Sequence, residues 1–300
     1  MLHKDHGLVI YVDCQPSEQI DDQFNDITAC LIGLCCLQPE IFDKYEQYKN
    51  VPSLDRPLVA EEIAKDLNAC DYINCYGTYA KLSAIKTIGE KFISKAQDSL
   101  SDDVIKKKAN IFKVLKRSLN HNSAFFIPWY SSSLFLMCYQ FSQIANQLNQ
   151  RNMLFSLDRF PGDPKGSMQL LKIISQYPPM LEASKRLEEK YGVTIIIANP
   201  MSYVDNGGVR KDARSHPGMV LIDWIVHSVY SAMNNLANVD TGTRDEEYRE
   251  SIIRPYQILK ERNLIHLESI GGIVFTNEND PDYTDEFKEI LASTYFVKAL

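Results

Sequence analysis

The sequence lacks any apolar run of about 18 residues, the length that a transmembrane helix needs. Its first six residues, MLHKDH, are polar and lead directly into a strand-like run. This start has neither the apolar stretch nor the small-residue cleavage site of a signal peptide. The 300 residues are 45% apolar and 24% charged, as in an ordinary globular protein. We therefore expect a soluble, cytoplasmic protein built as one large domain or two small ones.

The seven cysteines also lack the spacing of a disulfide framework. Their number is odd and most of them lie in apolar segments, which indicates reduced thiols. Cys70 and Cys75 have no second pair that would complete a zinc site. The chain also has no Walker-type loop, no GxGxxG, no nucleophile elbow and no HExxH. Function therefore has to be argued from individual residues.

Charge is unevenly distributed along the chain. The net charge of −7 argues against a general nucleic-acid binder, yet residues 80–120 contain ten basic and four acidic residues. We interpret about residues 78–125 as a basic helical insertion that contacts nucleic acid, with an ordinary solvated surface as the alternative. The candidate contacts are Lys106, Lys107, Lys108, Lys113, Lys116 and Arg117. The aromatic cluster just beyond, Phe125, Phe126, Trp129 and Tyr130, fits core packing better than base stacking.

The apolar pattern predicts alternating strands and helices. Strands are expected at residues 7–13, 27–37, 72–76, 153–157, 193–198 and 272–276. Helices are expected at residues 39–49, 58–68, 81–97, 102–119, 131–148, 167–191 (bent or interrupted at Pro178-Pro179), 217–235, 244–262 and 282–297. A polar loop is expected at 199–215. This order predicts an α/β protein with a mixed sheet and helices on its faces.

Three aspartates stand in chemically unusual places. Asp13 ends the strand VIYVD, Asp158 ends the strand MLFSLD, and Asp223 lies in the apolar helical run MVLIDWIVHSVY with His227 one turn later. A buried carboxylate in such a helix is costly unless it finds a partner or a metal. Carboxylate oxygens suit Mg²⁺ or Mn²⁺, and two such ions can activate a water and stabilise the leaving oxygen of a phosphodiester. The alternative is structural: strand-end aspartates cap turns, and Asp223 pairs with His227 or an arginine.

The loop before the last of these helices contains auxiliary candidates. Asp205 and Asp212 can supply further carboxylates. His216 can act as a general base or phosphate contact, although its place before Pro217 favours a helix-start role. The same loop is basic through Arg210, Lys211 and Arg214, as expected of a phosphate contact or equally of a solvated loop.

Short segments of the chain resemble the domain-of-unknown-function 3800 family, whose members have a ribonuclease H-like fold. The segments are Val12-Asp13-Cys14-Gln15, Leu157-Asp158-Arg159 and Met219-Val-Leu-Ile-Asp-Trp224. The family opens with Asp-Glu-Ser-Gly, so Cys14 and Gln15 depart from it. The resemblance implies a ribonuclease H-like domain at residues 1–238, with an α/β extension at 239–300 packed on the same domain. It also implies that Asp13, Asp158 and Asp223 are the metal-binding and catalytic carboxylates.

These observations support three hypotheses. The first is a metal-dependent nuclease that hydrolyses RNA or DNA. The second is a non-catalytic ribonuclease H-like module that binds a protein or nucleic-acid partner, or a second copy of itself, since Cys14 replaces a glutamate. The third is a small-molecule phosphohydrolase, which would not need the basic helices.

Overall fold

The computed structural model describes residues 7–16, 27–37, 39–99, 124–158, 178–198, 202–204, 208–234 and 246–270. Among these residues, no helix combines the length and apolarity that crossing a membrane requires. The predicted helix 102–119, strand 272–276 and helix 282–297 lie outside the described residues. So do Asp205 and the six candidate nucleic-acid contacts of the basic insertion.

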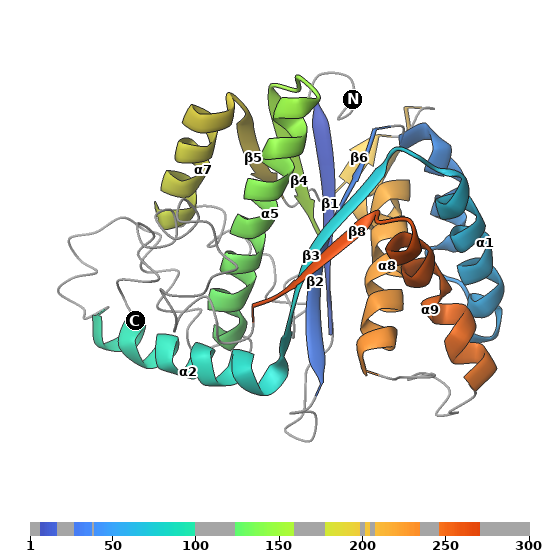
Figure 1. Cartoon of the computed structure of the whole chain (residues 1–300), viewed down its shortest axis with the longest axis horizontal. Coiled ribbons are helices and arrows are strands. Elements are labelled where there is room, and N and C mark those ends of the chain that lie inside the picture. Colours follow the sequence, from blue (N-terminus) through green and yellow to red (C-terminus); the bar gives the residue numbers. More distant parts are fainter. Residues whose placement is uncertain are drawn as a thin grey trace.

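The described chain forms a mixed six-stranded sheet with helices on both faces, which confirms the predicted architecture (Figure 1). The strands run in the order β5-β4-β1-β2-β3-β8. Their bounds are β1 Leu8–Gln15, β2 Thr28–Cys36, β3 Ile73–Lys81, β4 Asn152–Leu157, β5 Thr194–Ala198 and β8 Ile265–Ser269. β2 is antiparallel to both β1 and β3, whereas β4 pairs in parallel with β1, β5 with β4, and β8 with β3.

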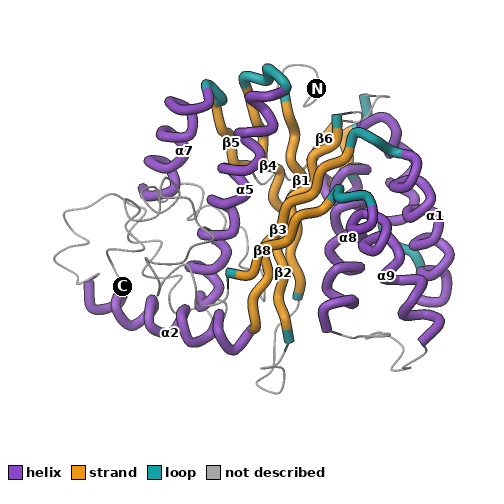
Figure 2. Tube along the Cα trace, in the orientation of Figure 1, coloured by secondary structure: helices purple, strands orange, loops and turns teal. Residues whose placement is uncertain are grey.

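Helices form a layer on each side of this sheet, as Figure 2 shows. One layer contains α2 (Leu82–Ser99), α5 (Ile127–Gln147) and α7 (Pro178–Tyr191). The other contains α1 (Arg56–Ala69), α8 (Pro217–Asn234) and α9 (Glu246–Glu261), with the 3₁₀ helix η2 (Pro39–Tyr48) against α8. Two hydrophobic cores result, one under each layer.

β2 shows why the sequence folds this way. Its nine residues are apolar apart from Thr28 and all are buried, because β1 and β3 flank the strand and a helical layer covers each face. Side chains alternate between the two cores, with Leu31 and Cys35 on the α5 side and Ile32 and Leu34 on the α8 side. A strand buried on both faces reads as a continuous apolar run.

Several elements of the structure differ from those predicted. β1 continues beyond residue 13 to Gln15, because Cys14 and Gln15 still pair with β2. Residues 39–48 form a 3₁₀ helix, and α7 begins at Pro178, where a bend or an interruption was expected. The predicted polar loop 199–215 contains a hairpin of β6 (Ser202–Val204) and β7 (Arg210–Asp212), followed by the short 3₁₀ helix η5 (Ala213–Ser215).

β8 was missed by the sequence reasoning. Its five residues, IHLES, alternate between apolar and polar, but the run is too short for this pattern to distinguish a strand from a connecting segment. β8 pairs in parallel with β3, and α9 packs on α1 and α8. Residues 246–270 therefore add to the same sheet and the same helical layer as the rest of the chain.

Candidate functional site

Asp13 and Asp158 lie on neighbouring strands at adjacent positions. Val12 of β1 pairs in parallel with Leu157 of β4, and the Asp158 N–H donates to the Val12 carbonyl at 3.0 Å. The next residue on each strand is an aspartate, so Asp13 and Asp158 lie side by side. Because β1 continues past Asp13, this carboxylate is in the strand interior and only 3% exposed. Asp158 follows the last residue of β4, and its side chain is 13% exposed.

Both carboxylates affect Tyr130 of α5. Burial raises the pKa of Tyr130 well above its ordinary value of 10.0, and Cys14, Asp13 and Asp158 add to the shift in that order. A phenol is already neutral at physiological pH with its ordinary pKa, so the shift in pKa leaves the charge of Tyr130 unchanged there. Its place in the core confirms that this aromatic residue packs in the interior, as do Phe126 and Trp129. The effect of both aspartates on its pKa was not foreseen, because the two lie on strands that only the fold brings together.

The start of α8 closes over the same part of the sheet. Ser156, two residues before Asp158, contacts the Sδ atom of Met219 at 3.7 Å. Tyr11, two residues before Asp13, stacks on His216 with ring centroids 5.1 Å apart. Tyr11 and Ser156 are next to Val12 and Leu157 along their strands, so their side chains point to the opposite face of the sheet. Val12 and Leu157 belong to the α5-side core. Asp13 and Asp158 therefore belong to the face that α8 covers.

His216 is a helix-start residue. Its Nδ1 atom accepts a hydrogen bond from the Gly218 N–H at 3.1 Å, and its carbonyl accepts from Met219 and Val220. The ring thus satisfies one of the unpaired N–H groups at the start of α8. This geometry favours the helix-start interpretation over a general base, since Nδ1 is already used as an acceptor.

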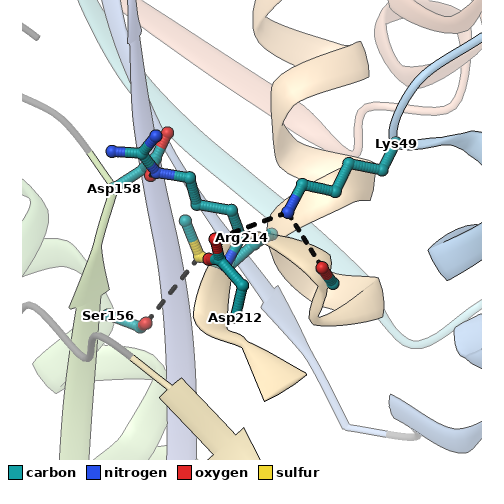
Figure 3. A network of polar contacts seen from close by, with 7 residues as sticks. Lys49, Ser156, Asp158, Asp212 and Arg214 are labelled. Carbon is teal, nitrogen blue, oxygen red and sulfur yellow. Dashed lines mark hydrogen bonds and ion pairs between the residues drawn. The ribbon is translucent and has the colours of Figure 1, made fainter.

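A network of polar contacts joins Asp158 to the loop before α8 (Figure 3). The Nε atom of Arg214 lies 3.2 Å from Oδ1 of Asp158. The Arg214 backbone N–H donates to Oδ1 of Asp212 at 2.8 Å. Lys49 donates to Oγ of Ser215 at 2.9 Å and lies 3.8 Å from Oδ2 of Asp212. Arg214 and Lys49 were not predicted as partners of these aspartates, because no local pattern links residues so far apart in the chain.

The basic loop is thus engaged with acidic side chains of the protein itself. Lys211 donates to both oxygens of Glu46 on η2, at 2.6 and 2.8 Å, and Arg214 pairs with Asp158. Asp212, a predicted auxiliary carboxylate, orders the loop through Arg214 and Lys49. Arg210 is exposed.

Asp223 differs from its prediction. The sequence placed it in a helix buried all round, but the residue is exposed, and His227 one turn later is half-buried. The remaining residues of α8 from Pro217 to Ser231 are buried, so these two form the outward stripe of the helix. The desolvation cost that singled out Asp223 therefore does not arise.

Asp13 and Asp158 remain the best candidates for holding a cation. In the described part of the chain, no three His, Cys, Asp or Glu side chains are grouped as metal ligands. Mg²⁺ is commonly bound through one or two carboxylates together with waters, so two adjacent aspartates fit such a site. The participation of Asp223, Asp205 and Asp212 stays a prediction.

Comparisons with known proteins give little further information. No protein-family model and no curated protein matches the chain. One solved structure with similarity is ribonuclease HII of Archaeoglobus fulgidus, determined in complex with PCNA. The two chains are 14% identical, the match covers 85% of this chain and 87% of the other, and the TM-score is 0.31. So low a TM-score carries no argument about function, and the resemblance to the domain-of-unknown-function 3800 family stays a prediction.

Proposed function

We propose that the protein is a metal-dependent nuclease with a ribonuclease H-like fold. The observation that supports this most is the pair Asp13 and Asp158, set side by side on parallel strands β1 and β4. Three antiparallel strands followed by two parallel ones, in the order β3-β2-β1-β4-β5, agree with the mixed sheet that such a fold implies.

Two carboxylates are proposed to bind the cation. Asp13 and Asp158 would hold Mg²⁺ or Mn²⁺, which supplies Lewis-acid stabilisation of charge on a phosphodiester and favours deprotonation of water. Asp13 lies on a strand that is paired on both sides, so its backbone is fixed in place. Asp223, the third carboxylate that the resemblance implies, lies on the exposed stripe of α8.

The solvent exposure of β5, the strand next to β4, supports access for a polymeric substrate. Ile196 of β5 pairs with Leu154 of β4, two strand positions before Ser156 and four before Asp158. Its side chain is 40% exposed, whereas Ile195 and Ile197 pack into the α5-side core. The face that carries the two aspartates is thus exposed to solvent at Ile196. The basic segment with Lys106, Lys107, Lys108, Lys113, Lys116 and Arg117 is proposed to contact the phosphates of the substrate.

The test is a cleavage assay on labelled RNA, DNA and RNA–DNA hybrid, each with Mn²⁺, Mg²⁺ or EDTA. We expect cleavage that needs the divalent cation and that falls by at least about 100-fold in Asp13→Asn and Asp158→Asn. Asp55→Asn removes the same charge from an exposed position of η3 (Ser53–Asp55) and serves as the matched control. Equal cleavage by the aspartate variants and by the control would refute the assignment.

A second function, partner binding without catalysis, is favoured by Cys14. The resemblance predicts a glutamate at this position, but the thiol points into the α5-side core and is fully buried. Position 14 therefore supplies no ligand to the aspartate face. Under this alternative, Asp13→Asn and Asp158→Asn would leave nucleic-acid binding unchanged in a gel-shift titration, with no cleavage by any variant.

A further inference from the structure

Arg214 places a positive charge on one of the two carboxylates that the proposed cation would need. Its Nε atom is 3.2 Å from Oδ1 of Asp158, and its side chain is 45% exposed while that of Asp158 is 13% exposed. Figure 3 shows the guanidinium lying against the carboxylate at the end of β4. The more accessible partner of this ion pair is therefore the arginine.

We propose that Arg214 is a displaceable internal cation that competes with the divalent ion for Asp158. This inference rests on the proposed function and adds its regulation. In the metal-free protein, Arg214 compensates the negative charge of the adjacent aspartates. A divalent cation binds only as the guanidinium leaves, because two cations close to one carboxylate repel each other.

The exchange needs only a side-chain movement. The backbone of Arg214 is held by its N–H bond to Asp212, and the following residue, Ser215, accepts a hydrogen bond from Lys49. Lys211, three residues earlier, is held by both oxygens of Glu46. These contacts fasten the loop on both sides of Arg214, so rotation of the long side chain is sufficient to uncover Asp158.

Release also presents Arg214 to the substrate. A guanidinium has five N–H donors in a planar arrangement that matches phosphate oxygens. A phosphodiester near Asp158 would therefore stabilise the released side chain. The same movement that admits the cation supplies a phosphate contact.

The test compares Mn²⁺ binding by the full chain with that of Arg214→Gln, measured by isothermal titration calorimetry. Removing a partly exposed ion pair of this kind should make Mn²⁺ binding about fivefold tighter. Lys211→Gln is the matched control, because it removes the same charge from the same loop but frees Glu46 instead of Asp158. We expect its Mn²⁺ affinity to equal that of the unmodified protein.

Thermal melting provides a second readout in case Arg214→Gln is less stable. Without metal, this variant should melt below the unmodified protein, because its two adjacent aspartates lose a compensating charge. Saturating Mn²⁺ should raise its melting temperature more than that of the unmodified protein. Asp158→Asn should abolish the difference in both measurements.

The outcomes separate the two proposals. Equal Mn²⁺ affinity with and without Arg214, together with loss of binding in Asp158→Asn, overturns the competition and leaves the nuclease proposal standing. An equal gain in Lys211→Gln overturns it as well, since general charge would then explain the effect. Absence of Mn²⁺ binding in all variants overturns both the competition and the metal-dependent function.

Discussion

Gly218, the second residue of α8, allows the helix to approach β1 closely beside the two aspartates. A Cβ atom at this position would lie 2.3 Å from Cε2 and 2.4 Å from Cζ of Tyr11, whereas ordinary contacts begin at 3.4 Å. Either the ring or the helix would therefore have to shift. The ring is hard to move, because it is buried and stacks on His216.

Gly218→Ala should therefore destabilise the protein. Overpacking of this kind costs about 1–3 kcal/mol, and the better helix propensity of alanine returns at most about 1 kcal/mol. We expect a net loss of about 1–2 kcal/mol in the free energy of unfolding, measured by urea denaturation followed by circular dichroism. The start of α8 would also shift relative to β1, so Mn²⁺ binding should weaken in the same variant.

A double-mutant cycle with Tyr11→Leu tests the cause. The smaller side chain removes the ring atoms that the new Cβ would meet. The cost of Gly218→Ala should then fall by more than about 0.5 kcal/mol relative to its cost with Tyr11 present. The reasoning would be refuted by unchanged stability of Gly218→Ala, or by an equal loss in both backgrounds.

Two further predictions concern stability. Arg262→Met should lower the free energy of unfolding by about 1–3 kcal/mol, because its Nη1 atom donates to the carbonyls of Leu67 and Cys70 at the end of α1, at 2.6 and 2.7 Å. The exposed neighbour Lys260→Met is the control, and equal urea midpoints for the two variants would contradict this. Stability should also fall as the pH rises above about 10, the ordinary tyrosine pKa. Burial holds several tyrosines neutral in the folded state, so above that pH the unfolded chain ionises first; a melting temperature independent of pH there would contradict this. These tyrosines are Tyr11, Tyr45, Tyr130 and Tyr230.

The elements that were predicted correctly are those with a strong local pattern. β2 and β4 are apolar runs bounded by polar residues, and α8 begins at Pro217, where proline suits the first helical position. The strands of the β6–β7 hairpin and β8 have only three to five residues each, which is too short for a local pattern to identify them. Their pairing depends on a partner strand that is distant in the sequence, as with β8 and β3.

In the candidate site too, some residues were identified from the sequence, whereas the contacts between them were not. Asp13 and Asp158 were identified from the sequence because each closes a run of apolar strand residues. Asp223 was identified for a reason that proved wrong, since an almost wholly apolar helix can still leave one stripe exposed. Arg214 was read as a loop cation, and its pairing with Asp158 was not predicted.

By itself, the sequence determined the apolar periods, and with them most strands, the helices and the α/β class, because burial of a side chain follows from its chemistry and its spacing. It also placed one aspartate in the first strand and another directly after the fourth. The tertiary structure decided the strand order that brings these two together, the face of α8 that meets them, and the arginine that lies on one of them. These are contacts between segments far apart in the chain, set by how two cores pack on one sheet, and no local pattern encodes them.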